Sequence, residues 1–146
     1  KAELLALIDE DTNAFNIMMD AMKNQNAVKK CGTAEEIAAA DVKMYEANKF
    51  AISIPLKVLE KSFELLPALK AVGERGNSNA VSDAGVGALL VESAVKSAAL
   101  NVKINLLNFK KEDPFYKASA DSMNKVLAVL DGSVNEILDI VEKKIS

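Results

Sequence analysis

The sequence predicts an all-α protein, an antiparallel helical bundle with long helices that prolines bend. Apolar residues recur at three- and four-residue spacing along most of the 146 residues, and this spacing marks one face of an α-helix. No segment shows the apolar-polar alternation that indicates a β-strand. Half of the residues are hydrophobic and 27% are charged, which is ordinary for a soluble globular protein. We therefore expect a single helical domain over residues 1–146.

The first helix is expected over about residues 2–22, where apolar side chains alternate at four- and three-residue spacing. Asp11 fills the gap in this series between Ile8 and Phe15. The pattern therefore places Asp11 at a core position, where a charged group is costly to bury alone. The segment 23–32 is rich in Asn and Lys and is expected to be a polar loop.

The second helix is expected to begin at residues 33–36, Thr-Ala-Glu-Glu, which have the spacing of a capping box. Pro55 lies inside this helix. Because proline has no backbone N–H, it should kink the helix and free the carbonyl of Ala51 for another partner. Pro67 predicts a further bend or a restart.

The third helix is expected after a loop framed by Gly73 and Gly76, and it runs to about Leu106. Asp113 and Pro114 then form a cap followed by a first-turn proline. This pair predicts a fourth helix that continues to the end of the chain.

The third helix carries an acid and several amides among small apolar residues. At about 100° per residue, Asp83 lies about 180° from Glu92, which is taken to mark the solvent side, so Asp83 is expected to face the core. Asn101 falls on the same inward side, and Asn79 and Asn105 lie about 40° from that line. However, Asp83 and Asn101 are about 27 Å apart along the axis. They cannot share one small site within one helix. Either they serve opposite ends of a cleft, or a symmetry mate brings one end near the other.

Composition excludes several classes of site. The chain has no histidine, which removes the usual zinc sites and a Ser-His-Asp triad, and no metal site is expected. The single cysteine, Cys31, cannot form an internal disulfide, which favours a cytoplasmic protein. A net charge of −3 without a basic stripe argues against nucleic acid. No apolar run of membrane-spanning length is expected, and hence no membrane partner.

Three blocks of sequence occur in a definite order. They are LIDEDTNAF at residues 7–15, IPL at residues 54–56, and N-x-N-x-V-S-D-A-G-V followed by A-A-L-N-V-x-I-N-L within residues 77–106. These blocks resemble the cyclodeaminase domain of formiminotransferase-cyclodeaminase, a family that also includes methenyltetrahydrofolate cyclohydrolases. The family normally begins with a glycine-rich segment similar to G-G-G-S-x-A-A-L. Nothing like it precedes Lys1, so the chain is expected to lack that segment.

The resemblance implies a homodimeric folate one-carbon enzyme, which cyclises 5-formiminotetrahydrofolate to 5,10-methenyltetrahydrofolate with release of ammonia. A first alternative keeps the site and changes the reaction, so that water adds to methenyltetrahydrofolate and gives 10-formyltetrahydrofolate. A second alternative, from another class, is a helical module that serves assembly or binding without catalysis. No cofactor is expected beyond the tetrahydrofolate substrate.

Candidate catalytic residues are carboxylates, because the chain offers no histidine for proton transfer. Asp11 and Asp83 are chosen by position and by motif, and Asp9 is a further candidate in the same acidic triplet. If Asp11 and Asp83 meet in a cleft, burial and mutual repulsion would raise the pKa of at least one of them. Amides suit the donor and acceptor edge of a pterin, and a lysine suits the anionic tail. The candidate substrate-binding residues are Asn79, Ser82, Asn101, Asn105 and Lys57.

Overall fold

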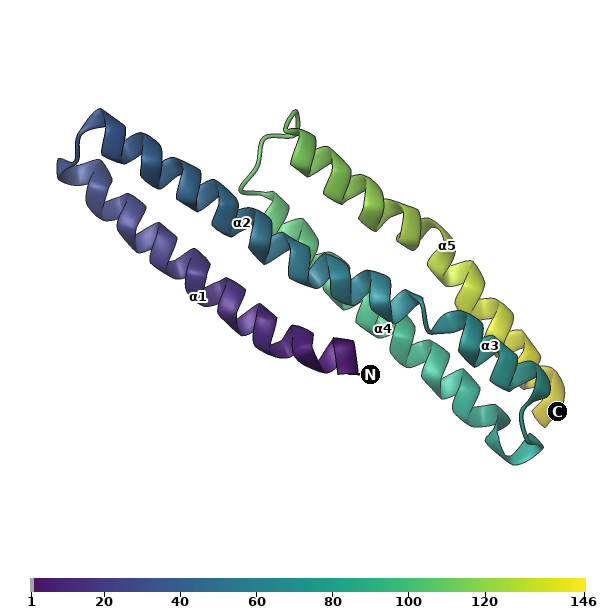
Figure 1. Cartoon of the computed structure of the whole chain (residues 1–146). Helices are drawn as coiled ribbons and strands as arrows, with labels where there is room; N and C mark the ends of the chain where they lie inside the picture. The colour runs from purple at the N-terminus through teal and green to yellow at the C-terminus, as the bar shows by residue number, and fades with distance from the viewer. Residues whose placement is uncertain (1) are drawn as a thin grey trace.

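The computed structural model describes residues 2–146, apart from the side chain of Ser78, and contains no β-strand in that range. The predicted all-α bundle is therefore confirmed. Its elements are α1 (Ala2–Cys31), α2 (Ala34–Phe63), α3 (Leu66–Arg75), the 3-10 turn η1 (Ser78–Ala80), α4 (Val81–Leu106) and α5 (Pro114–Ile145). Figure 1 shows α1 and α2 as a long antiparallel hairpin, with α4 passing behind α2 and beside α3, and with α5 on the side of α2 away from α1.

Helix α1 is longer than the sequence suggested. The polar loop expected over residues 23–32 is wrong, because the helix continues to Cys31. Two side chains of its last turns reach the facing helix, where Gln25 Nε2 lies 2.7 Å and Lys29 Nζ 3.3 Å from Asp41 Oδ1. Lys29 also places a positive charge at the helix C-terminus, where the macrodipole favours it. These tertiary contacts stabilise a helix that the polar sequence alone does not predict.

Both predicted helix starts are confirmed. The backbone N–H of Glu36 donates to Thr33 Oγ1 at 3.3 Å, and the N–H of Thr33 donates to Glu36 Oε2 at 2.8 Å, which completes a capping box. At the start of α5, the N–H of Phe115 donates to Asp113 Oδ1 at 2.7 Å, and Pro114 occupies the first helical position.

Two predicted effects of the inner prolines are confirmed, the restart at Pro67 and a new partner for the Ala51 carbonyl. Helix α2 ends at Phe63, and α3 begins at Leu66 with Pro67 in its first turn, so Pro67 marks a restart. Pro55 lies within α2. The carbonyl of Ala51, which Pro55 leaves without a helical donor, accepts a hydrogen bond from Asn105 Nδ2 of α4 at 3.3 Å. This bond joins α2 and α4 beside the proline.

Helix α4 lies at the centre of the bundle and packs against α2, α3 and α5. The main core gathers around it, and its fully buried members include Ile52, Leu59, Val95, Leu130 and Ile137. Helix α1 stands apart from this core. It packs on α2 through a small second cluster formed by Leu7, Ala14 and Ile54.

Within residues 2–146, α4 is long and apolar enough to cross a membrane by length and composition alone, with a mean hydropathy of 1.2. The expectation that no segment reaches that length is therefore wrong by this criterion. The finding is weak evidence for a membrane, because the central helix of a bundle passes the same test. Helix α4 fits that description, since one of its faces forms the core. Its opposite face is apolar as well, and it is exposed.

Candidate functional site

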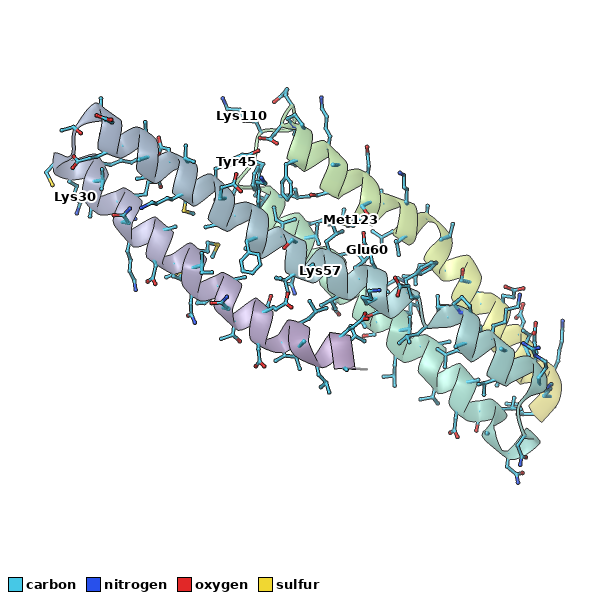
Figure 2. The ribbon with its side chains drawn as sticks, in the orientation of Figure 1. Lys30, Tyr45, Lys57, Glu60, Lys110 and Met123 are labelled. Atoms are coloured by element: carbon cyan, nitrogen blue, oxygen red, sulfur yellow. The ribbon has the colours of Figure 1, made fainter. Side chains whose placement is uncertain are left out.

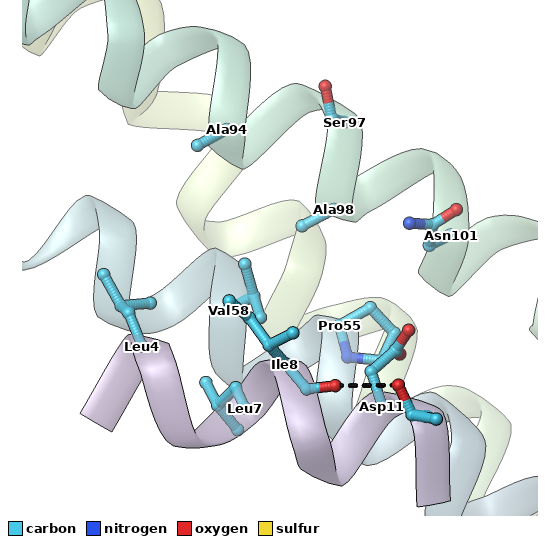
Figure 3. Close-up of a pocket in the computed structure, with 11 residues that line it drawn as sticks. Leu4, Leu7, Ile8, Asp11, Pro55, Val58, Ala94, Ser97, Ala98 and Asn101 are labelled. Carbon is cyan, nitrogen blue, oxygen red and sulfur yellow. Dashed lines mark hydrogen bonds between the residues drawn. The ribbon is translucent and has the colours of Figure 1, made fainter. Parts of the chain in front are cut away.

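A groove runs between α1 and α4, with α2 as its floor (Figure 3). Its larger cavity, of about 520 Å³, is mostly apolar. A smaller cavity of about 170 Å³ adjoins it and is more polar. The two cavities share Asp11, Pro55 and Asn101. The groove therefore has an apolar stretch and a polar end that meet at these three residues.

The polar end brings together three residues that the sequence singled out. Asp11 comes from α1, and Asn101 and Asn105 come from successive turns of α4. Figure 3 shows Asp11 and Asn101 on facing helices at the same end of the groove, with Pro55 near them. Among the described residues that line the two cavities, Asp11 is the only carboxylate. It is exposed at the groove wall, so the expected core position of Asp11 is wrong.

Two amide hydrogen bonds fix the end of α4 and the start of the following loop on α2. The Nδ2 of Asn105 donates to the carbonyl of Ala51. The Oδ1 of Asn105 is then the acceptor that this side chain offers to the smaller cavity. One turn further, Asn108 Nδ2 donates to Oδ1 of the buried Asn48 at 3.1 Å. The amide edge at the polar end is thereby held in one orientation.

The structure adds two polar residues that sequence reasoning missed. Thr12 and Ser97 line the larger cavity. Thr12 Oγ1 donates to the carbonyl of Ile8 at 3.2 Å, drawn as the dashed line in Figure 3. Ser97 lies four residues before Asn101, and side chains four residues apart share a helix face. That spacing was the signal that could have found it.

The expected inward orientation of Asp83 is wrong. Asp83 and Ser82 are exposed in the first turn of α4, and Asn79 is exposed in η1. None of the three lines the groove between α1 and α4. Within one chain the structure therefore brings Asp11 together with Asn101 and Asn105, and leaves the Asp83 end of α4 about 27 Å away along the helix axis.

The reason lies in the residues that were taken to mark solvent. Glu92 has a side chain only 24% exposed, and Lys96 bridges it to Asp131 of α5, with N–O distances of 2.6 and 3.0 Å. These charges therefore mark the edge of α4 beside α5. The face of α4 that points away from the core is apolar. The prediction took the charged residues to mark that face, and it therefore assigned the core to the wrong side of the helix.

The remaining predicted residues lie outside the groove. Asp9 is exposed and lines neither cavity. Lys57 Nζ pairs with Glu10 across α1 and α2 at 3.5 Å, with both side chains about half exposed. Figure 2 shows Lys57 on α2, on the side that faces α1.

An aromatic cluster secures the loop between α4 and α5. Tyr45 of α2 stacks edge-on against Phe109 with ring centroids 5.3 Å apart, and Phe109 contacts Phe115 at the same distance. The hydroxyl of Tyr45 donates to Asp113 at 3.2 Å. Partial burial, and then the Asp113 carboxylate, raise the pKa of Tyr45. We assign this cluster a structural role, because it anchors the start of α5.

Comparison with known proteins identifies a family and several related sequences. The family profile described as Formiminotransferase-cyclodeaminase matches residues 1–125. The chain is 32% identical over 142 residues to the formimidoyltransferase-cyclodeaminase of Gallus gallus, which covers 97% of the chain and 25% of that protein. It is 33% identical over 147 residues to the methenyltetrahydrofolate cyclohydrolase of Methylorubrum extorquens, covering 98% of the chain and 66% of that protein.

A third relative is the formimidoyltransferase-cyclodeaminase of Dictyostelium discoideum, which is 30% identical over 134 residues, covering 92% of the chain and 23% of that protein. The chain thus spans about a quarter of the bifunctional relatives and about two thirds of the cyclohydrolase. The family profile covers most of the chain, including Asp11, Pro55 and both asparagines of the polar end. The chain therefore belongs to the formiminotransferase-cyclodeaminase family.

Proposed function

We propose that the chain cyclises 5-formiminotetrahydrofolate to 5,10-methenyltetrahydrofolate and releases ammonia. The observation that carries this proposal is the meeting of Asp11 with Asn101 and Asn105 at the polar end of an otherwise apolar groove. A reduced pterin needs hydrogen-bonding groups along one edge, whereas the aminobenzoyl ring needs apolar surface. The polar end of the groove offers the hydrogen-bonding groups, and the adjoining apolar stretch offers the apolar surface.

In this proposal the amides orient the pterin, and Asp11 moves the proton. N10 of the folate attacks the formimino carbon and loses its proton to the Asp11 carboxylate. The same proton then passes to the amino group, and the C–N bond breaks as ammonia leaves. The formimino group reacts in its protonated form, which carries two of the three hydrogens of ammonia and the positive charge of the methenyl product. One carboxylate is then sufficient, because the proton that N10 gives up is the third hydrogen. No cofactor beyond the folate takes part.

A second candidate is hydration of methenyltetrahydrofolate to 10-formyltetrahydrofolate. The similarity to a methenyltetrahydrofolate cyclohydrolase favours this reaction. The chain spans a far larger share of that protein than of the formimidoyltransferase-cyclodeaminases. In this version Asp11 activates a water that adds to the methenyl carbon. The binding groove is the same, and only the bound folate differs.

The assay supplies each folate separately and records methenyl absorbance together with ammonia. The leading proposal expects methenyl absorbance and ammonia to appear in equal amounts from the formimino substrate. Loss of methenyl absorbance, with no ammonia from the formimino substrate, would establish the hydrolase instead. If neither folate turns over or binds, the helical module without catalysis is correct.

We also propose that the protein acts as a homodimer in the cytoplasm. Two observations support self-association. The family resemblance implies a dimer, and α4 presents an exposed apolar face opposite the core. Sedimentation at micromolar concentrations tests it, and a monomer at all concentrations would exclude it.

A further inference from the structure

The floor of the groove carries a backbone carbonyl that a proline leaves without its helical donor. In an uninterrupted α-helix, the carbonyl of Ala51 would accept a hydrogen bond from the backbone N–H four residues later. That residue is Pro55, which has no N–H. Both residues are buried in α2, and Nδ2 of Asn105, 3.3 Å away, is the donor that the carbonyl receives from α4. Pro55 therefore decides that α2 is bonded to a side chain at this point and not to its own backbone.

This bond selects one of the two orientations of the Asn105 amide. The oxygen and the nitrogen of an amide have nearly the same shape and opposite hydrogen-bonding character. If the amide turned over, Oδ1 of Asn105 would face the oxygen of Ala51, and two acceptors would meet with no proton between them. The Ala51 carbonyl therefore keeps Nδ2 toward α2 and Oδ1 toward the smaller cavity.

The smaller cavity is consequently rich in acceptors. Three polar side chains line it, those of Asp11, Asn101 and Asn105. The Asp11 carboxylate only accepts hydrogen bonds, and Asn105 presents its oxygen. Within the part of the chain that the structure describes, Asn101 has no hydrogen-bond partner, so it is able to turn either end of its amide toward a ligand. Such a set favours a ligand edge that carries donors.

The order of residues along the groove indicates which edge of a folate this is. Asp11 and Asn101 line both cavities, whereas Asn105 lines only the smaller one. Asn105 lies four residues beyond Asn101, or about 6 Å further along α4. In a folate, N10 lies where the pterin joins the aminobenzoyl group, and the 2-amino group and N3–H lie at the far edge of the pterin. With N10 at Asp11 and the pterin in the smaller cavity, this donor edge points toward Asn105.

We propose that Pro55 is a positioning residue that acts through Asn105 and makes the site selective for a pteridine with a 2-amino group. The proposal rests on the proposed function, which places the pterin at the polar end. Because Pro55 withholds a backbone donor, the oxygen of Asn105 stays toward the cavity and accepts from the donor edge of the pterin. A pteridine with an oxo group in place of the 2-amino group sets an acceptor against this oxygen and is rejected. Unpaired polar groups of this kind give binding sites strong discrimination.

Calorimetric titration measures this preference without any folate turnover. The two probes are 6-methyltetrahydropterin and 6-methyltetrahydrolumazine, which has an oxo group in place of the 2-amino group. The wild type should bind the pterin about tenfold more tightly than the lumazine, the equivalent of one hydrogen bond.

Pro55→Ala should change the two affinities in opposite directions. The variant restores a backbone N–H for the Ala51 carbonyl, and it should remain folded because a helix interior favours alanine over proline. The released Asn105 amide is then able to turn its Nδ2 toward the oxo group, so the lumazine should bind more tightly than it does to the wild type. The pterin should bind only about twofold more weakly, since about half of the amides have the wrong orientation. General damage to the site would instead weaken both.

A second substitution should rescue the preference. In the double variant Pro55→Ala/Asn105→Asp, the backbone binds the Ala51 carbonyl and neither oxygen of the new carboxylate donates, so the preference for the pterin should return. Pro67→Ala is the matched control, because Pro67 lies in the first turn of α3 and lines neither cavity. Its preference should equal that of the wild type. In heteronuclear NMR, the side-chain amide protons of Asn105 should exchange slowly in the wild type and faster in Pro55→Ala.

Several results would overturn the role of Pro55. They are equal affinity of the wild type for the two pteridines, binding of neither, fast exchange of the Asn105 amide protons in the wild type, and an unchanged preference in Pro55→Ala. Turnover of a folate alongside any of these results would leave the proposed function intact. A preference that Pro55→Ala removes, without turnover of either folate by the wild type, would reject the proposed function and retain Pro55 as a positioning residue.

Discussion

Asp11 interrupts the apolar stripe of α1 without being a buried charge. The sequence marked it because it interrupts an apolar stripe, and that interruption was read as a buried charge. In the structure the interruption opens into the groove, where water can reach the carboxylate. A carboxylate at a groove wall keeps its ability to exchange protons with a bound substrate.

Replacing Asp11 with Asn should reduce turnover by a factor of about 10²–10⁴ and change the folding stability little, because the variant removes a proton acceptor and keeps the shape. Asp20→Asn is the matched control, since Asp20 lies on the same helix, outside the groove, with its side chain 81% exposed. Turnover measured by methenyl absorbance should be normal in the control. Equal losses in both variants would contradict the assignment.

Asn105 links the site to the stability of the fold. Asn105→Ala should lower the free energy of unfolding by about 1–3 kcal/mol. Pro55 has no backbone N–H to donate to the Ala51 carbonyl, so this carbonyl depends on Asn105 Nδ2 and would lose its hydrogen bond in the variant. Urea unfolding measures this change. Asn124→Ala, at an exposed site on α5, should change it by less than about 0.5 kcal/mol.

At the scale of helices, the sequence predicted the features that depend on local chemistry. The Thr33 capping box, the Asp113 cap and the restart at Pro67 follow from neighbouring residues alone. The length of α1 and the orientation of α4 did not follow. Both depend on contacts made across the bundle, to Asp41 in one case and to Asp131 in the other.

The capping box predicts a dependence of stability on pH. The backbone N–H and then the hydroxyl of Thr33 lower the pKa of Glu36 from its ordinary value of 4.5. This contribution to stability is present above pH 4.5 and is lost as the pH falls through the lower pKa of the folded state. Glu36→Gln should therefore show a smaller loss of thermal stability than the wild type on acidification. An equal loss of thermal stability in both proteins on acidification would show that Glu36 is not the source of the pH dependence.

Gly132 is a weak point in α5 that can be improved. Gly132→Ala should raise the free energy of unfolding by about 1 kcal/mol, since alanine favours the helix and a Cβ at this position meets no atom within 4 Å. Gly85→Ala is the comparison, because its Cβ would meet Val141 at 3.4 Å in the packed core. A clear gain should appear in denaturant unfolding only for Gly132→Ala.

For the whole molecule, the sequence predicted the bundle but not which surface remains uncovered. The wheel for α4 assumed that charged residues mark the face opposite the core, and this assumption fails because the outward face of α4 is apolar. Period and composition show that a helix has two apolar faces. They do not say which face the same chain covers, because that depends on where α2, α3 and α5 pack.

If the exposed apolar face of α4 pairs two chains, the temperature of thermal unfolding should rise with protein concentration, because association stabilises the folded state. A chain carrying Leu90→Asp and Leu100→Asp, both on that face, should lose this dependence, since association would bury carboxylates in an apolar interface. Differential scanning calorimetry over a hundredfold range of concentration measures the effect. The same dependence in the wild type and the variant would exclude this face of α4 as its cause.

Because α1 rests on α2 and has no share in the main core, the helix that carries Asp11 can open without disrupting the rest of the bundle. Its amide protons should exchange with solvent faster than those of α4, which forms the opposite wall. We therefore expect the α1 wall of the groove to be more mobile than the α4 wall. Under the proposed function, folate enters by displacement of α1, while the asparagines on α4 keep their positions.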